Sequence, residues 1–358
     1  MAIYPQTETD QRLAAADLQR VIEEIFAACG MGQEDANLLA ATLVHADLRG
    51  VHSHGTLRVP EYVRKLTVDG VNPRGRPRVV SGKGAAVVID ADNSMGQIAG
   101  TFAMRMAIEQ ARVTGLAFAA VRGSNHCGAL DWYTLMAARA DMVGLAGTNA
   151  LPTMAPWGGI DKVVGINPLS IAFPGRQTKP FVLDFAFGAT AHGKIRVYHQ
   201  KGSPIPSGWA FDKEGRPTTD AAAALDGLIQ PIGGHKGVGL GMAIGMLSSL
   251  LSGAAYGTES GNMAEGAKVG VDGHFFMAID LAAFGEAEVV KGRVDAIAEE
   301  VHQSRCAEGT LRLFIPGEIE DEIEAGYAAK GISLARETVE GIRRVARSLG
   351  TRTELLPI

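Results

Sequence analysis

The spacing of apolar residues predicts that the first 80 residues are mainly helical. Between residues 11 and 29, apolar side chains from Leu18 to Phe26 recur at helical intervals, and Gly30 ends the pattern. A second run over 34–48 repeats this spacing, and a further helix is expected to begin at Pro60, because proline is tolerated in a first helical turn.

Beyond a link rich in glycine, proline and arginine, short apolar runs alternate with helical patterns, which is typical of an α/β chain. One uncharged apolar run, Gly237–Ala255, is long enough to raise the question of a membrane span. It has no partner span and no flanking basic cluster, so a buried helix in a soluble core is expected. Strands are predicted at 85–91, 116–121, 143–147, 170–173, 181–185, 275–281 and 311–315, and helices at 97–112, 129–140, 289–301 and 334–349.

Composition narrows the classes of function. The 358 residues are 46% hydrophobic and 20% charged, with a net charge of −5 and no basic block, so neither nucleic-acid binding nor a membrane-surface role is indicated. The three cysteines are widely separated, and no histidine or cysteine spacing is that of a metal site, so no metal is expected. The N-terminus has no apolar signal region, and a cytoplasmic location is expected.

The stretch Asp47–Arg64 carries the densest candidate chemistry. Its His-Ser-His-Gly turn lies between two predicted helices and places Ser53 and His54 close to Arg58. A proton donor, a hydroxyl and an anion anchor are thereby combined, although a surface turn with solvated charges would contain the same residues.

Three further glycine-flanked clusters lie at junctions between predicted elements. In 122–130, free backbone N–H groups suit a phosphate and His126 suits acid/base work, or the segment simply caps a helix. Asp184, at a strand end, suits a ribose hydroxyl or caps a turn. His235 and Lys236 precede the apolar run. A lysine at this position could bind an anion, or it could simply be exposed to solvent. No G-x-G-x-x-G, phosphate loop or G-x-S-x-G is present, so a nucleotide would need another architecture.

Seven ordered motifs together resemble the type-2 malate/L-lactate dehydrogenase family, over residues 11 to 350 approximately. That family also includes ureidoglycolate, sulfolactate and diketogulonate enzymes and cyclic imino acid reductases. The motifs are HSHGTLRVPEY, RGSNHCGALDWY, GINPLSIAFP, VLDFAFGATAHGK, PSGWAFDKEGRPTTD, GGHKGVGLGMAIGMLSSLLSGA and LFIPGE.

The resemblance implies an α/β, non-Rossmann NAD(P)-binding fold, with a mixed β-sheet core and a mainly helical lobe built from the N-terminal region and the C-terminal helices. Residues 1–80 would carry the catalytic turn, 81–317 would form the NAD(P)-binding domain, and 318–358 would pack back on the N-terminal region. The family resemblance also implies a homodimer.

Residue by residue, the resemblance implies His54 as the acid/base group, Ser53 as its support and His126 as a second histidine that some members use as acid/base. Arg58 would clamp the substrate carboxylate, with His192 and Gly193 also at the substrate. The expected contacts to NAD or NADP are Gly128, Ala129, Leu130, Asp184, Phe185, Ala186, His235, Lys236, Pro316 and Gly317.

The expected reaction is hydride transfer between a nicotinamide and a 2-hydroxy or 2-keto acid, as in malate or lactate dehydrogenases. Reduction of a cyclic imino acid is the alternative, and Lys194 argues against it because those reductases have aspartate there. Ile166 stands where many members have threonine, which leaves the particular substrate open. A catalytically silent nucleotide-binding protein and, more weakly, a metal-dependent hydrolase are the remaining alternatives.

Overall fold

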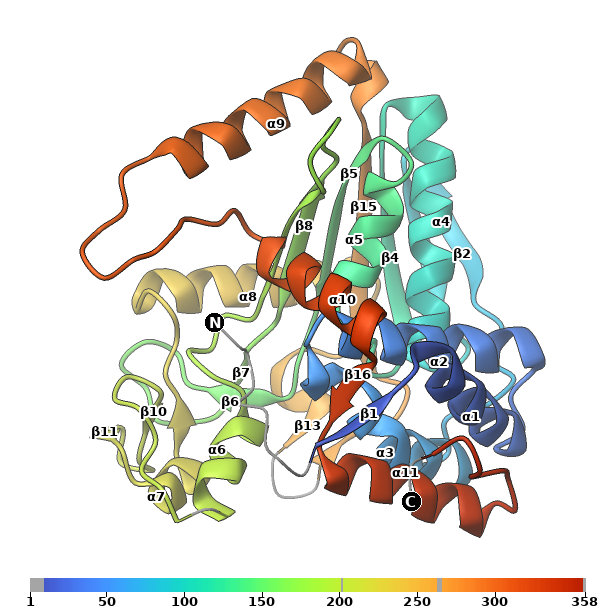
Figure 1. The fold of residues 1–358 in the computed structure, drawn as a ribbon, viewed down its shortest axis with the longest axis vertical. Coiled ribbons are helices and arrows are strands. Elements are labelled where there is room, and N and C mark those ends of the chain that lie inside the picture. The colour runs from blue at the N-terminus through green and yellow to red at the C-terminus, as the bar shows by residue number, and fades with distance from the viewer. Residues whose placement is uncertain (1–9, 201, 263–265, 357–358) are drawn as a thin grey trace.

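The structure is a computed structural model that describes residues 10–200, 202–262 and 266–356. Its centre is a seven-stranded mixed sheet in the order β2-β3-β4-β15-β5-β8-β9 (Figure 1). Only β3 and β4 pair in parallel; the other neighbours in this sheet are antiparallel. The strands are β2 (Arg78–Lys83), β3 (Ala86–Asp90), β4 (Leu116–Ser124), β5 (Met142–Thr148), β8 (Leu169–Phe173), β9 (Phe181–Phe185) and β15 (Asp272–Asp280).

Helices cover both faces of this sheet. On one face, α4 (Gly96–Thr114) and α5 (Asp131–Ala138) enclose an apolar core in which alanines allow close packing around Tyr133 and Phe276. On the other face, α8 (His235–Ser249) contacts β4, β5 and β15. Beside it lie α6 (His192–Gln200), α7 (Ala221–Asp226) and the short strands β6 (Pro152–Met154), β7 (Val164–Gly165), β10 (Ala210–Phe211), β11 (Pro217–Thr218) and β12 (Leu228–Ile229).

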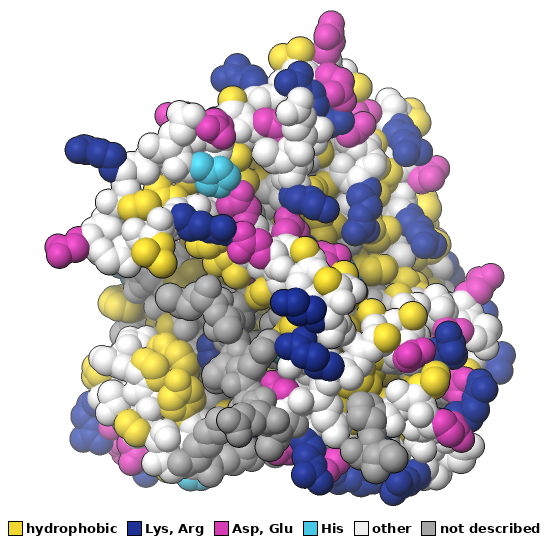
Figure 2. All heavy atoms as spheres, viewed as in Figure 1, with side chains coloured by type: hydrophobic (Ala, Val, Ile, Leu, Met, Phe, Trp, Pro, Cys, Tyr) yellow, Lys and Arg dark blue, Asp and Glu magenta, His cyan; other side chains and the backbone are white. Residues whose placement is uncertain are grey.

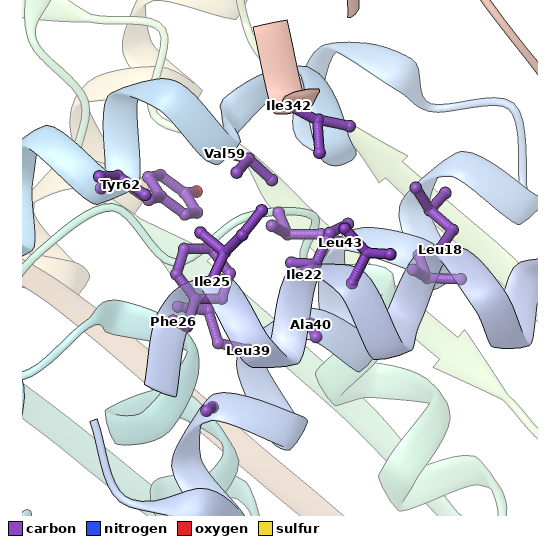
Figure 3. Close-up of a cluster of buried hydrophobic side chains, with 14 of the residues drawn as sticks. Leu18, Ile22, Ile25, Phe26, Leu39, Ala40, Leu43, Val59, Tyr62 and Ile342 are labelled. Atoms are coloured by element: carbon purple, nitrogen blue, oxygen red, sulfur yellow. The ribbon is translucent and has the colours of Figure 1, made fainter. Parts of the chain in front are cut away.

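A helical lobe joins the two ends of the chain. Leu18, Leu39, Val59 and Ile342 come from four different helices and share one buried cluster (Figure 3). The short strand β1 (Gln11–Leu13) pairs with β16 (Ile332–Leu334) and ties the ends together. The helices of this lobe are α1 (Ala15–Ala28), α2 (Gln33–Leu48), α3 (Val59–Arg64) with a π-helical turn over Lys65–Asp69, α10 (Glu318–Lys330) and α11 (Arg336–Ser348). The helix α9 (Ala287–Gln303) lies apart from the lobe, beyond the end of β15 (Figure 1). The proposed domain boundaries at 80 and 317 remain a prediction.

Two sequence predictions are wrong. Residues 311–315 form no strand; they belong to the segment between α9 and α10, and Phe314 and Ile315 line a cavity, which explains their apolar character. The apolar run 237–255 is a buried helix only in part, because α8 ends at Ser249 and one side of it is exposed at Leu240 and Leu247.

Acidic and basic side chains are mixed over the surface seen in Figure 2, so this face carries no extended field of one sign. None of the helices in the described part of the chain has the length and apolar character needed to cross a bilayer. Over the same residues, no group of three or more histidine, cysteine, aspartate and glutamate side chains is arranged to hold a metal ion.

Candidate active site

The His-Ser-His-Gly segment folds as two successive single turns of 3-10 helix, His52–His54 and Thr56–Arg58, between α2 and α3. Asp47, at the end of α2, holds both turns: its carboxylate accepts from the backbone N–H of Thr56 at 2.8 Å and pairs with Nδ1 of His52 at 2.7 Å. Gly55 is required between them, because a Cβ at this position would overlap the Asp47 carboxylate.

This turn places His54 against His126 from the loop after β4. The two rings are stacked, with centroids 5.5 Å apart and planes 19° from parallel. Nδ1 of His54 is 2.9 Å from the Ser53 hydroxyl, while Nδ1 of His126 is 2.6 Å from the Tyr62 hydroxyl. Burial, and then the positive charge of Arg58, lowers the pKa of His54 to about 4; the same two causes hold the pKa of His126 well below its usual value.

Arg58 lies at the exposed edge of this pair. Its Nε donates to the carbonyl of Ser53 at 2.7 Å, and its Nη1 donates to Glu61 at 2.7 Å. The side chain is 32% exposed, so a carboxylate from solution can approach the guanidinium. The guanidinium is therefore aligned by the same residue whose hydroxyl contacts His54.

A cavity of about 560 Å³ opens beside Ser53 and His54, a volume within the roughly 300–1,000 Å³ usual for small-molecule sites. Ile166, Pro168 and Val182 contribute apolar walls. Of the residues expected at the cofactor, three segments meet here: Gly128–Leu130, Asp184–Ala186 and Pro316–Gly317. The structure thus brings together residues that are separated by almost 200 positions in the sequence.

A buried ionic network supports the wall that carries Asp131 and Asp184. The backbone N–H of Asp131 donates to the Asp184 carboxylate at 2.8 Å. Nε of Arg49 lies 2.8 Å from the Asp131 carboxylate, and its Nη1 lies 2.6 Å from Asp321 on α10. Burial and the nearby Asp131 charge raise the pKa of Asp184. Burial alone would also raise the pKa of Asp131, but His45 and Arg49 outweigh it and hold that pKa low.

Four expected site residues lie elsewhere in this chain. His192 begins α6, and its Nε2 donates to the carbonyl of Leu225 at 3.3 Å, while Gly193 is exposed beside it. His235 and Lys236 are exposed at the start of α8, where the His235 ring lies edge-on to Trp157. None of these four residues lines the cavity, and their assignment to substrate or cofactor remains a prediction. Arg58 and His126 do not line it either; they border it through their contacts with Ser53 and His54.

Sequence reasoning assigned no role to Asp47, Tyr62, Gln97 or Asp131. Arg49 belongs to the candidate stretch Asp47–Arg64, but its buried ion pairs were not predicted. Tyr62 ends the HSHGTLRVPEY motif and Gln97 begins a predicted helix, but nothing in the sequence indicated that Gln97 donates to the Tyr62 hydroxyl at 3.0 Å. A signal existed for Asp47 and Arg49, since charged residues that end an apolar helix must find partners when they are buried.

Comparison with known proteins gives a consistent result. Residues 13–343 match the family model described as malate/L-lactate dehydrogenase. The chain is 38% identical to the L-sulfolactate dehydrogenase of Methanocaldococcus jannaschii over 336 residues, which are 94% of this chain and 96% of that protein. It is 37% identical to the malate dehydrogenase of Pyrococcus horikoshii over 338 residues, 92% of this chain and 93% of the relative. The solved Methanocaldococcus jannaschii sulfolactate dehydrogenase superposes with a TM-score of 0.89 at 37% identity, covering 96% of this chain and 98% of that one.

Fold, cavity and relatives define an NAD(P)-dependent oxidoreductase that acts on hydroxy acids. The chain belongs to the malate/L-lactate dehydrogenase family. The family resemblance inferred from the seven motifs is thereby confirmed, as are the mixed α/β fold and the enzyme class.

Relatives within this similarity use either coenzyme. The Escherichia coli K12 relative, 31% identical over 90% of this chain and 92% of its own length, is a ureidoglycolate dehydrogenase named for NAD(+). The Chromohalobacter salexigens relative, 35% identical over 76% of this chain and 83% of its own length, is a (2R)-3-sulfolactate dehydrogenase named for NADP(+).

The residues present fit a nicotinamide coenzyme. Asp184 is exposed to the cavity through part of its side chain, so its carboxylate is available to a hydroxyl group there. Phe185, Ile166 and Val182 offer apolar surface suited to an aromatic ring. Gly317, with φ +100°, lies so close to Val182 that a Cβ would approach it to 3.1 Å, which lets the backbone of the 316–317 turn close against β9.

Proposed function

We propose that the enzyme transfers a hydride between a nicotinamide coenzyme and a 2-hydroxy or 2-keto acid, with His54 as the acid/base group and Arg58 as the carboxylate anchor. The observation that carries the proposal is the position of His54. Its Nδ1 contacts the Ser53 hydroxyl, it lines an apolar cavity, and Arg58 is held beside it by the carbonyl of Ser53.

The chain's own residues then have to orient the substrate, neutralise its charge and move one proton. Bound NAD(P) would supply or accept the hydride. The planar guanidinium of Arg58 suits bidentate binding of the substrate carboxylate, which also fixes the adjacent carbonyl carbon. His54 takes the hydroxyl proton in the oxidising direction and returns it to the carbonyl oxygen in the reducing direction. The apolar wall formed by Ile166, Pro168 and Val182 would limit the access of water to the reacting atoms.

Substrate binding would also prepare His54 for the reducing direction. In the free enzyme, burial and Arg58 favour the neutral ring, which can accept a proton. A bound carboxylate offsets the positive charge of Arg58, so the pKa of His54 should rise when the substrate is present. The same residue can therefore act as a base on the hydroxy acid and as an acid on the keto acid.

The test is oxidation of NADH and NADPH by the purified enzyme against a panel of 2-keto acids. Turnover on a keto acid is expected, and it would identify the coenzyme and substrate class together. Arg58→Ala should lower kcat/KM by about 10- to 100-fold, the range expected for loss of a charge-assisted hydrogen bond. Arg64→Ala is the control and should leave kcat/KM unchanged, because it removes an exposed arginine that pairs with Asp69 on the same helical segment. Equal effects of the two substitutions would remove Arg58 from the proposal.

A cyclic imino acid belongs in the same panel. The structure of delta1-piperideine-2-carboxylate reductase from Pseudomonas syringae pvar. tomato superposes with a TM-score of 0.83 at 29% identity, covering 94% of this chain and all of that one. In this chain Lys194, which replaces the aspartate of such reductases, lies 5.2 Å from the Trp209 ring centroid and does not line the cavity. Turnover on the imine alone would overturn the hydroxy-acid assignment.

We further propose that the enzyme is a homodimer in which the exposed side of α8 faces the second copy. This helix has apolar side chains on both sides: Val238 and Ile244 are buried, whereas Leu240 is 57% exposed and Leu251, just beyond the helix, is 55% exposed. A helix that is hydrophobic all round is normally buried on all sides, so a partner surface is required.

Light scattering measures the mass of the assembly directly. The wild-type enzyme should have twice the 37.6 kDa of one chain, and the double variant Leu240→Glu, Leu251→Glu should have the mass of one. Val113→Glu is the control, because Val113 is an exposed apolar residue on α4, away from α8. A wild-type mass of one chain would contradict the dimer.

A further inference from the structure

We propose that Tyr62 and Gln97 are positioning residues that keep His126 neutral with its proton on Nε2. His126 would then donate a hydrogen bond to the substrate oxygen while His54 alone transfers the proton. This inference rests on the proposed function and deepens it, because it gives the two stacked histidines different tasks.

The hydrogen bonds at Nδ1 of His126 determine which nitrogen carries the proton. The backbone N–H of Gly128 points at this Nδ1 at 3.4 Å, and the Tyr62 hydroxyl lies 2.6 Å from it. A backbone N–H can only donate, so this Nδ1 is an acceptor and carries no hydrogen. In a neutral imidazole the remaining proton must then be on Nε2, which becomes a donor.

Gln97 completes this arrangement from the other side of the tyrosine. Its Nε2 donates to the Tyr62 hydroxyl at 3.0 Å, so the hydroxyl oxygen already accepts a hydrogen bond and directs its own proton to His126. Both residues are fully buried; Gln97 is in the first turn of α4, and Tyr62 packs in the apolar cluster of the helical lobe (Figure 3). Their side chains therefore have little freedom to reorient.

The loop conformation is adapted to the same contact. Gly128 has φ +74°, a left-handed backbone conformation that turns its N–H back towards His126. A Cβ at Gly128 would lie 3.1 Å from Nε2 of Gln97, so a side chain here would disturb the donor to Tyr62. Cys127 lies between His126 and Gly128, and its carbonyl accepts a hydrogen bond of 2.6 Å from the Tyr133 hydroxyl, which helps to hold the loop.

The two histidines differ in what their Nδ1 atoms contact. Ser53 presents a hydroxyl to His54, and a hydroxyl can donate to the neutral ring or accept from the protonated one. His126 faces the N–H of Gly128, which cannot accept. His54 can thus change its protonation state without losing its partner, whereas protonation of His126 at Nδ1 would set two donors against each other.

The charged surroundings act in the same direction. Arg58, His54, Lys65 and His274 each lower the pKa of His126, after the larger effect of burial. Burial also raises the pKa of Tyr62, which keeps its hydroxyl protonated and able to donate. With the rings stacked at 5.5 Å, two simultaneous positive charges are disfavoured.

The first test is NMR of isotope-labelled histidines in the intact enzyme, which reports tautomer and titration without requiring turnover. His126 should remain neutral with its proton on Nε2 between about pH 5 and pH 8, the range in which histidine normally titrates. A proton on Nδ1, or titration within that range, would overturn the inference even if the enzyme reduces keto acids. Failure to turn over any hydroxy acid, with the expected tautomer observed, would instead count against the proposed function.

Kinetics of variants give an independent readout. Tyr62→Phe should lower kcat by about 10-fold or more and mix the two tautomers, since a displacement of about 1 Å at a reacting group can cost ~100-fold in rate. Gln97→Met, which removes the donor with little change of shape, should act in the same direction but less. Tyr198→Phe is the control, because this tyrosine of α6 packs edge-on against Trp209 in a different apolar cluster, and it should leave the tautomer unchanged.

Replacement of His126 itself separates donation from proton transfer. His126→Asn retains an N–H donor and should keep more activity than His126→Ala, with the acidic limb of the pH profile still set by His54. Equal loss in both variants, together with loss of that limb, would show that His126 transfers the proton and would overturn the division of tasks.

Discussion

Asp47 offers a sharp test of how the catalytic turn is held. Its carboxylate is 1% exposed and makes two hydrogen bonds, to the N–H of Thr56 and to His52. Each hydrogen bond to a charged group contributes about 1.5–3 kcal/mol. Asp47→Ala removes two such bonds and should therefore lower the free energy of unfolding by about 3–6 kcal/mol. Asp47→Asn should cost less, because it keeps one acceptor oxygen.

Activity should fall further than stability alone explains. Asp47 fixes both ends of the segment that carries His54, and a displacement of about 1 Å at a reacting group can cost ~100-fold in rate. We expect Asp47→Asn to reduce kcat by about this factor. Coenzyme affinity should stay as in the wild type, because the segments expected at the coenzyme come from other parts of the chain.

The assay combines urea unfolding with steady-state kinetics at a temperature where every variant is folded. Asp295→Asn is the matched control, because that carboxylate also accepts backbone N–H groups, from Arg176, Gln177 and Thr178, and none of these residues lines the cavity. The control should lose stability and keep its kcat. A wild-type kcat in Asp47→Asn would refute the claim that Asp47 positions His54.

Three further predictions concern ionisable side chains in the protein interior and at the site. Arg49→Met should lower the free energy of unfolding by about 3–5 kcal/mol, measured in urea, because it leaves Asp131 and Asp321 without their cation; wild-type stability would contradict the network. His274 is fully buried, and burial lowers its pKa to about 4. As pH falls from about 6.5 towards 4, the unfolded chain binds a proton at this histidine that the folded chain does not bind, so the free energy of unfolding decreases. Since the raised pKa of Asp272 acts oppositely, the test compares the wild type with His274→Gln, which should show a shallower loss over this window; parallel curves would contradict it. Finally, a non-reactive dicarboxylate bound at Arg58 should raise the pKa of His54 by NMR, and an unchanged value would mean that the anion binds elsewhere.

The regular elements were largely predictable because their signals are local. The helical period in α1 and the apolar runs of β5 and β9 arise from residues that are adjacent in sequence. The order of the strands in the sheet was not predictable, since β15 inserts between β4 and β5 although it follows β5 by more than 120 residues in the sequence. The exposed side of α8 was missed for a related reason: apolar composition indicates burial but does not distinguish a core from an interface.

The site was predictable in part. Ser53 and His54 stand together in one motif, and the turn could be expected from the sequence. Tyr62 and Gln97 could not, because their contact joins α3 to α4, and each residue alone fits an ordinary helical pattern. Phe314 and Ile315 led to a wrong strand because a cavity wall needs the same apolar residues that a strand does.

The most direct test of the central claim is the rate of NAD(P)H oxidation on the best keto acid of the panel, measured for the wild type and His54→Ala with equal coenzyme saturation. General acid–base catalysis is typically worth about 100- to 10,000-fold, so kcat should fall by at least about 100-fold while the dissociation constant of the coenzyme is unchanged. A folded His54→Ala enzyme with wild-type kcat would contradict the account.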